Sequence, residues 1–188
     1  MSKIPFNMKY SIGDDLREVP DDAVQMQKGL LWLQENFSKM EDQKSPKAAA
    51  TLSRIGTFAR MLGDLEVAES SFQDSLVILE EKGRSDQALA VKLRLAIVHQ
   101  FKGDYAKADN FYVNAIKVMK NSKDERINRF LDFALQHLAK SRFEQKFYRE
   151  ALDYSLEALE IRLIKGDMDL IQSTEQVISK VRANLDDS

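Results

Sequence analysis

The sequence of 188 residues contains no cysteine, which excludes disulfide bonds, thiolate nucleophiles, cysteine-rich zinc sites and iron–sulfur clusters. It has two histidines, His99 and His137, so a metal site would depend on carboxylates and a histidine-based triad would have two candidate bases. No phosphate-binding glycine loop and no nucleophile-elbow motif is present. The sequence therefore predicts no catalytic residue, no metal ligand and no cofactor.

The sequence also lacks an excess of one charge and any long apolar run. Its 28 basic and 30 acidic residues give a net charge of −2, which provides no overall field for nucleic acid. Charged residues recur every few positions, so no stretch reaches the roughly 20 apolar residues that span a bilayer. The first residues have no apolar segment of the kind that a secretory signal needs. We expect a cytoplasmic protein that neither binds nucleic acid nor inserts into a membrane.

Proline is confined to the beginning of the chain, at Pro5, Pro20 and Pro46. The long proline-free remainder is typical of helices, because proline lacks a backbone N–H and clashes with the preceding helical turn. Residues 1–20 mix proline, glycine and charge without periodicity, which predicts an extended or mobile arm. Apolar residues at alternating positions could dock part of this arm: Ile4, Phe6, Met8 and Tyr10.

Residues 21–42 have the periodicity of a first helix. Asp21 is positioned as its N-cap, and apolar residues recur at spacings of three and four. This apolar stripe consists of Ala23, Met26, Leu30, Leu33, Phe37 and Met40. Trp32 lies off the stripe, so it either packs on the next helix or is exposed to a partner. Ser45 and Pro46 then form a strong start signal for a second helix.

Three segments after Pro46 are similar to one another. In the first two, the pairs that begin at Gly63 and Gly103 are Gly-Asp, and an alanine follows each glycine by five residues. The third segment has Lys146 in place of the glycine. The three alanines lie 40 and 43 residues apart. The aligned small residues are Gly56, Ala96 and Ala139 in the first halves and Ala68, Ala108 and Ala151 in the second halves.

Each repeated position has a physical role in a helical hairpin. The glycine ends one helix in the left-handed conformation, and the aspartate after it caps the next helix. The small residues let two antiparallel helices approach closely. Ser122 and Glu125 have the spacing of a capping box that opens the third pair, and Asp167 is placed to cap a last helix. The pattern predicts helix–turn–helix corners that divide the chain into stacked pairs.

This arrangement resembles the tetratricopeptide repeat (TPR) family. The second copy meets the family's pattern best, through Gly103, Tyr105, Ala108, Tyr112, Ala115 and Ile116. The third copy departs from it, with Lys146 for glycine and Ser155 for an aromatic residue. The period exceeds the usual 34 residues and is similar to that of the kinesin-light-chain and peptide-sensing-regulator branches. The resemblance implies an all-α fold, a right-handed α-solenoid of antiparallel helix pairs with about eight helices.

On this reading, residues 21–188 form a single TPR-like helical domain after the arm. The first helix is followed by three repeats and a capping helix, which would cover the apolar end of the last pair. The predicted segments are 21–42 for the first helix, 46–83, 85–121 and 123–166 for the repeats, and 167–186 for the capping helix.

The resemblance also implies that the first helix of each pair lines a concave groove. The groove residues that follow from the register are Arg54, Thr57, Arg60, Arg94, Ile97, Gln100, Phe101, His137, Lys140 and Phe143. Cationic and apolar side chains without an acid favour an acidic peptide with apolar anchors as the ligand. The alternative is that some of Leu93, Ile97 and Phe101 belong to the core of the second pair and that the arginines pair with neighbouring acids.

We therefore expect a non-enzymatic scaffold or adaptor that binds a peptide or a partner protein in this groove. One alternative is a regulatory sensor, whose solenoid changes shape when a peptide or small ligand binds. Another is an all-helical enzyme without a readable motif. The sequence identifies neither the partner nor the oligomeric state, so self-association stays open.

Overall fold

The computed structural model describes residues 3–186, and its internal contacts divide the chain into two compact units, Met1–Lys102 and Gly103–Ser188. We call them the first and the second unit and describe each by itself. The boundary lies at the Gly103 corner, inside the predicted repeat 85–121. The single helical domain over 21–188 stays a prediction.

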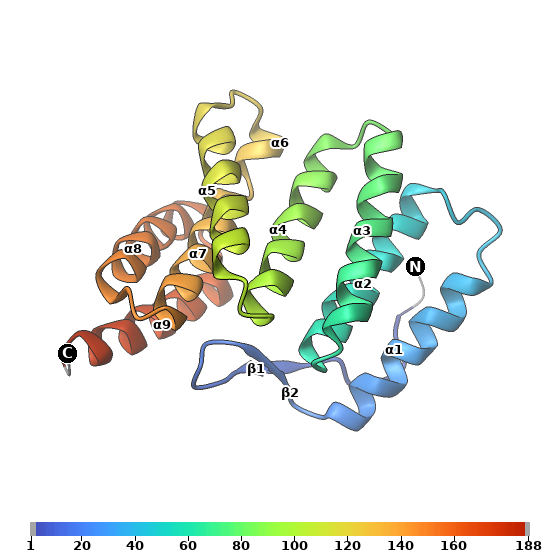
Figure 1. Ribbon diagram of the computed structural model, residues 1–188, viewed down its shortest axis with the longest axis horizontal. Helices are drawn as coiled ribbons and strands as arrows, with labels where there is room; N and C mark the ends of the chain where they lie inside the picture. The colour runs from blue at the N-terminus through green and yellow to red at the C-terminus, as the bar shows by residue number, and fades with distance from the viewer. Residues whose placement is uncertain (1–2, 187–188) are drawn as a thin grey trace. The chain divides into compact units, whose positions relative to one another are not determined.

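The first unit contains a short β-hairpin followed by four helices (Figure 1). The helix α2 packs against α1 and α3, and α3 packs against α4, so each helix lies next to its neighbour in sequence. Their shared core is formed by buried aliphatic residues and by Phe72, which has no exposed surface. The elements are β1 Tyr10–Ile12, β2 Glu18–Pro20, α1 Ala23–Ser38, α2 Pro46–Met61, α3 Leu65–Glu81 and α4 Ser85–Phe101.

The local signals predicted for α2 and α3 are confirmed. Ser45 caps α2 by accepting a hydrogen bond from the Ala48 backbone N–H at 3.2 Å. At the corner between α2 and α3, Gly63 has a φ of +84° and Asp64 caps α3. A Cβ atom at Gly56 would lie 3.0 Å from the Phe72 ring, so the missing side chain sets how closely α2 approaches α3.

The first residues form more structure than the predicted extended arm. Strands β1 and β2 pair antiparallel, with Tyr10 opposite Pro20. Ile4 is buried, and Met8 packs on α1 at Gly29, where an added Cβ would lie 2.2 Å from the Met8 sulfur. Tyr10, which the alternating pattern assigned to the docked face, is 50% exposed. Phe6 also packs against this core, so three of the four predicted docking residues hold the segment against the helices.

The cap of α1 is Asp22, so the prediction of Asp21 was wrong by one residue. Asp22 accepts a hydrogen bond from the Gln25 backbone N–H at 2.9 Å. Asp21 instead accepts one from the Ser11 hydroxyl at 2.6 Å. Asp21 thus binds Ser11 of the hairpin, and Asp22 caps the helix.

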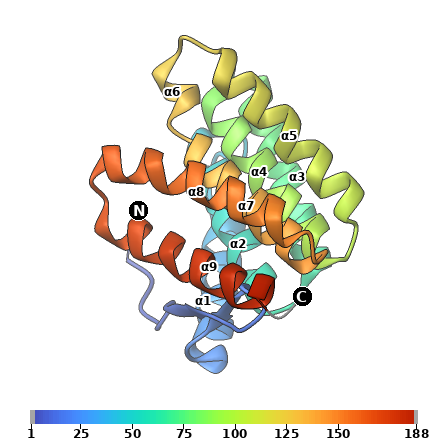
Figure 2. The same ribbon diagram turned by 90° about the vertical axis from the view of Figure 1, so that its left-hand side faces the viewer.

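The second unit contains four long helices and one short one (Figure 2). The helix α7 packs against α5 and α8, and α9 packs along α8. The elements are α5 Tyr105–Asn121, α6 Glu125–Asn128, α7 Leu131–Glu144, α8 Tyr148–Lys165 and α9 Met168–Asp186. Residues 3–186 thus contain eight long helices, as the sequence predicted, together with the single-turn α6. None of the helices in this range combines the length and the apolar character that a membrane span requires.

The corners of the second unit follow the predicted pattern at two places and depart from it at one. Lys146 adopts a φ of +66°, the left-handed conformation that glycine has at the corresponding corner of the first unit. Asp167 accepts a hydrogen bond from the Leu170 backbone N–H, as expected of the cap of α9. The predicted capping box at Ser122 is wrong, because Asp124 caps the four-residue α6 and α7 begins only at Leu131.

Candidate functional site

In the first unit, one aromatic ring at the end of α4 lies against two arginine side chains. The guanidinium carbon of Arg17 is 4.4 Å from the centre of the Phe101 ring, and that of Arg60 is 4.7 Å away. Arg60 also donates a hydrogen bond from Nη1 to Oε2 of Glu18 at 2.8 Å. The side chains of this ion pair are 4% and 11% exposed. The hairpin therefore supplies a carboxylate to an arginine that the sequence assigned to a binding groove.

Arg94 lies on α4, close enough to Arg60 for the two charges to interact. Burial, and then the positive charge of Arg60, lower the pKa of Arg94. Its guanidinium donates to the Ala90 backbone carbonyl at 3.1 Å, and no carboxylate within residues 3–186 forms an ion pair with it. We call Arg60, Arg94 and Phe101 the α2–α4 face. The Arg94 guanidinium on this face is partly buried. Its hydrogen bond to the Ala90 carbonyl of the same helix does not neutralise its positive charge.

The hairpin turn presents an apolar and an acidic residue two positions apart. The Gly13 backbone N–H donates to the Arg17 carbonyl at 2.8 Å and closes the turn. Leu16 has a φ of +63° and is 4% exposed. A non-glycine residue in this conformation costs about 1 kcal/mol. Leu16 and Glu18 thus have the combination of side chains that the groove hypothesis assigned to a partner peptide.

The other predicted groove residues of the first unit lie in different surroundings. Arg54 lines a pocket between α1 and α2. The Thr57 hydroxyl donates to the Ser53 carbonyl at 2.8 Å. Ile97 and Gln100 are 2% and 1% exposed, as the core alternative expected of Ile97. Of the seven residues predicted in this unit, Arg60 contacts Phe101 and lies near Arg94.

The three predicted groove residues of the second unit lie on α7. His137 is 6% exposed and packs among aromatic rings, with its centroid 4.3 Å from that of Phe133 and 6.5 Å from that of Tyr112. Lys140 is 4% exposed and has an interaction partner. Phe143 is partly buried and lies 5.6 Å from the Tyr148 ring. His137 and Lys140 are thus packed side chains, and Phe143 keeps part of its surface accessible.

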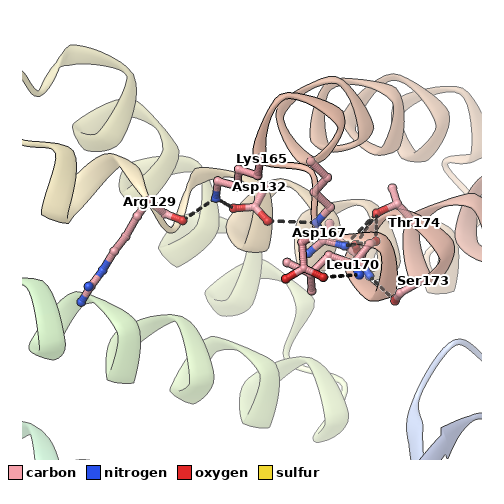
Figure 3. A network of polar contacts seen from close by, with 9 residues as sticks. Arg129, Asp132, Lys165, Asp167, Leu170, Ser173 and Thr174 are labelled. Carbon is pink, nitrogen blue, oxygen red and sulfur yellow. Dashed lines mark hydrogen bonds and ion pairs between the residues drawn. The ribbon is translucent and has the colours of Figure 1, made fainter.

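A buried ionic network in the second unit was not predicted from the sequence (Figure 3). Arg162 donates from Nε to Asp132 at 2.9 Å and from Nη1 to Thr174 at 2.7 Å, and it also contacts the Gln136 side chain. Lys165 pairs with the same Asp132 and donates to the Arg129 carbonyl at 2.7 Å. The Arg129 side chain points away from the network in Figure 3.

A signal for this network was present in the repeat alignment. Arg162 follows Ala151 by eleven residues, and the residues at that offset in the other copies are Leu79 and Met119. Those two are 3% and 1% exposed, and Arg162 is 2% exposed. A charge at a core position of a repeat requires a buried partner, so it predicts an acid on a neighbouring helix.

Comparison with known proteins identifies the repeated part of the chain. Residues 47–121, which cover most of α2 and all of α3, α4 and α5, match the model of the tetratricopeptide repeat family. These residues are similar to tetratricopeptide repeats. No curated protein matches the sequence at a significant level.

Solved structures with the same fold are also TPR-like. The nearly identical TPR-like repeats of a kinesin-light-chain-like protein from Podosopora anserina superpose with a TM-score of 0.56, at 15% identity, over 86% of this chain and 88% of that one. A variant of the same protein gives a TM-score of 0.61 at 13% identity, over 87% and 80%. BtubC (BKLC) from P. vanneervenii gives 0.55 at 17% identity, over 87% and 68%. The predicted all-α fold of TPR-like helix pairs is confirmed.

The TPR match ends before the third predicted copy, but the fold continues. The structural superpositions cover more of the chain than residues 47–121. The left-handed Lys146 also places a TPR-like corner where the family's glycine is missing. Tetratricopeptide repeats are in general protein-interaction scaffolds, which supports the general function predicted from the sequence.

Proposed function

We propose that this chain is a non-enzymatic interaction module that binds an acidic peptide segment with apolar anchors at the α2–α4 face. The observation that carries the proposal is the buried contact between Arg60 and Glu18. A carboxylate from an extended segment already lies on this face, so its geometry suits an acidic ligand. The lack of enzymatic activity and the cytoplasmic location stay predictions.

Arg94 is the residue that we assign to the partner's carboxylate. Among residues 3–186 it has no ion-pair partner, and its pKa is lowered by burial and by the neighbouring Arg60 charge. A ligand carboxylate would relieve this repulsion and would interact in a partly desolvated place, where charge-assisted hydrogen bonds are strongest. Phe101, seven residues further along α4, is partly exposed and supplies the apolar surface.

In the second unit, taken by itself, one of the three predicted groove residues keeps accessible surface. His137 and Lys140 are buried and already packed or partnered, whereas Phe143 is partly accessible. Phe143 stays a predicted apolar ligand contact within the second unit alone, and we assign His137 and Lys140 the support of α7.

The proposal is tested by titrating the full chain with a fluorescein-labelled peptide that alternates glutamate and leucine, with anisotropy as the readout. Replacing Arg94 by glutamine should weaken binding by about 10-fold or more, because a charge-assisted hydrogen bond contributes about 1.5–3 kcal/mol. Lys82→Gln, at an exposed helix end of the same unit, is the matched control and should leave affinity unchanged. Equal affinity of the Arg94→Gln and wild-type proteins would contradict the proposal.

A second candidate function is regulated binding, and the hairpin favours it. Glu18 offers this face the same carboxylate chemistry as the proposed ligand, and the hairpin that carries it holds Leu16 in a strained backbone conformation. In a regulated module the ligand displaces the hairpin, which converts binding into a change of shape. Glu18→Gln should then raise the affinity for the acidic peptide several-fold. An unchanged or lower affinity would leave the module unregulated.

A further inference from the structure

A pocket of about 120 Å³ lies between α1 and α2 in the first unit. Its place is independent of the α2–α4 face, because none of Arg60, Arg94 and Phe101 lines it. It is lined by Trp32, Leu33, Asn36, Met40, Lys47, Thr51 and Arg54.

The two helices divide the chemistry of this α1–α2 pocket between them. Lys47, Thr51 and Arg54 are four and three residues apart, so they lie on one side of α2. Thr51 is 4% exposed and Leu33 is 2% exposed, whereas Lys47 is exposed. Trp32 supplies apolar surface from α1, and Met40 supplies it from the loop after α1. The pocket therefore has a cationic wall and an apolar wall.

The cationic wall of the pocket differs between its two cations, because Arg54 already has an interaction partner whereas Lys47 forms no ion pair among residues 3–186. None of the seven lining residues is acidic. Nearby acids are engaged elsewhere, since Glu35 pairs with Lys39 at 2.6 Å and Asp42 accepts from the Lys44 backbone N–H. Lys47 also lies in the first turn of α2, which contains no acidic residue. A cation at the positive end of a helix raises the local potential, which an anion would lower.

Asn36 adds a hydrogen-bonding group whose orientation is set. Its side-chain NH₂ donates to the Trp32 carbonyl at 2.7 Å, so its Oδ1 can accept a hydrogen bond from a ligand. A ligand that matches all these groups carries an anionic oxygen for the cations, an N–H for Asn36 and an apolar group for Trp32.

We propose that the α1–α2 pocket binds a small carboxylate that carries an apolar group, with an N–H next to the carboxylate-bearing carbon. Lys47 and Arg54 bind the carboxylate, and Trp32 and Met40 contact the apolar group. The volume suits one residue-sized group, because pockets for larger drug-like ligands are about 300–1,000 Å³. Such chemistry occurs in a free N-acylated amino acid and at the C-terminal residue of a peptide.

The single tryptophan makes this pocket directly observable, because Trp32 alone gives the intrinsic indole fluorescence. N-acetylleucine, titrated into the full chain, should change the Trp32 emission saturably with a Kd near 1 mM, as expected of a ligand of this size. N-acetylleucinamide keeps the shape but lacks the charge, and it should bind at least 10-fold more weakly. Equal responses to the two compounds would overturn the proposal.

Two variants test the assignment of the cations. Lys47→Gln replaces an exposed side chain, so the protein should fold normally and bind N-acetylleucine about 5- to 10-fold more weakly. Lys82→Gln is the matched control, and its affinity should equal that of the wild type. Unchanged affinity in Lys47→Gln would overturn the proposal.

Two further experiments follow. The first distinguishes a peptide C-terminus from a free acid as the source of the carboxylate, and the second distinguishes the α1–α2 pocket from the α2–α4 face. A short acetylated peptide with a C-terminal leucine should bind more tightly than N-acetylleucine if the natural ligand is a chain end, and equally if it is a free acid. Arg94→Gln should leave the Trp32 response intact. Failure of acidic-peptide binding at the α2–α4 face is thereby distinguishable from failure at this pocket.

Discussion

Arg162 on α8 and Asp132 on α7 form a buried ion pair, with Nε of the arginine 2.9 Å from Oδ2 of the aspartate and side-chain exposures of 3% and 4%. In the aligned copies the arginine position is occupied by Leu79 and Met119, both buried. The third helix pair has therefore replaced an apolar contact by an ionic network. Removing one ion from such a network costs stability, because the charge of its partner is then buried without compensation.

Arg162→Met restores the residue type of the second copy but leaves Asp132 with one cation fewer. We expect a loss of about 3–5 kcal/mol in the free energy of unfolding, because the substitution leaves a buried carboxylate insufficiently paired. Urea denaturation followed by circular dichroism measures this loss. The exposed Arg182 on α9 is the control, and Arg182→Met should change stability by less than about 0.5 kcal/mol. A loss below about 1 kcal/mol for Arg162→Met would show that the network is not structural.

Lys146 and Gly103 provide a reciprocal pair of substitutions at equivalent corners. Lys146 has a φ of +66° and Gly103 a φ of +80°. Lys146→Gly should stabilise the protein by about 1 kcal/mol, and Gly103→Ala should destabilise it by a similar amount, because side chains disfavour the left-handed region. Thermal unfolding of the two variants tests this, and a destabilising Lys146→Gly would contradict the corner assignment.

The close contact between Gly56 and Phe72 predicts an overpacking effect. An added Cβ would already lie 3.0 Å from the ring, so Gly56→Leu should push α2 from α3 and cost about 1–3 kcal/mol. Ala50 is exposed on the same helix, and Ala50→Leu is the control for the helix propensity of leucine. The difference between the two changes in unfolding free energy gives the packing cost once it is corrected for glycine, which is a poorer helix former than alanine by about 1 kcal/mol. Equal midpoints would mean that α2 and α3 can separate freely.

Asp124 should titrate below the ordinary range of an aspartate. Hydrogen bonds from the Arg126 side chain and then from its backbone N–H hold the pKa of Asp124 down. A lowered folded-state pKa stabilises α6 above the unfolded-state pKa, and this contribution is lost as the pH falls through the folded-state value. Carbon-detected NMR titration of the carboxyl group measures it. In Arg126→Ala the pKa should rise toward the ordinary value, and an unchanged pKa would contradict the assignment.

The parts of the fold that local chemistry determines were predictable from the sequence. Gly63 and Ser45 act through residues within a few positions, so their corners and caps could be read directly. The predicted caps Asp21 and Ser122 were wrong, because a neighbouring aspartate, Asp22 or Asp124, caps the helix instead. The choice of cap is decided by a distant hydroxyl in one case and by the single-turn α6 in the other.

The candidate site was predictable only in part. Helical register indicates the side of a helix on which a residue lies, but not whether its side chain is buried or exposed. Arg94 and Phe101 are seven residues apart on α4, and the register placed them on one side correctly. It also included Gln100, which is 1% exposed. Glu18 and Arg60 lie 42 positions apart, and two three-residue strands carry too little periodicity to reveal the hairpin that joins them.

The most direct test of the proposed function is an NMR spectrum of the arginine Nε–Hε groups during titration with the acidic peptide. Arg94→Gln assigns the Arg94 signal, because that signal disappears in the variant. We expect the Arg94 Hε signal to shift downfield and to saturate with the same Kd as the anisotropy titration, because a carboxylate accepts its hydrogen bond. An unmoved Arg94 signal at saturating peptide would contradict it.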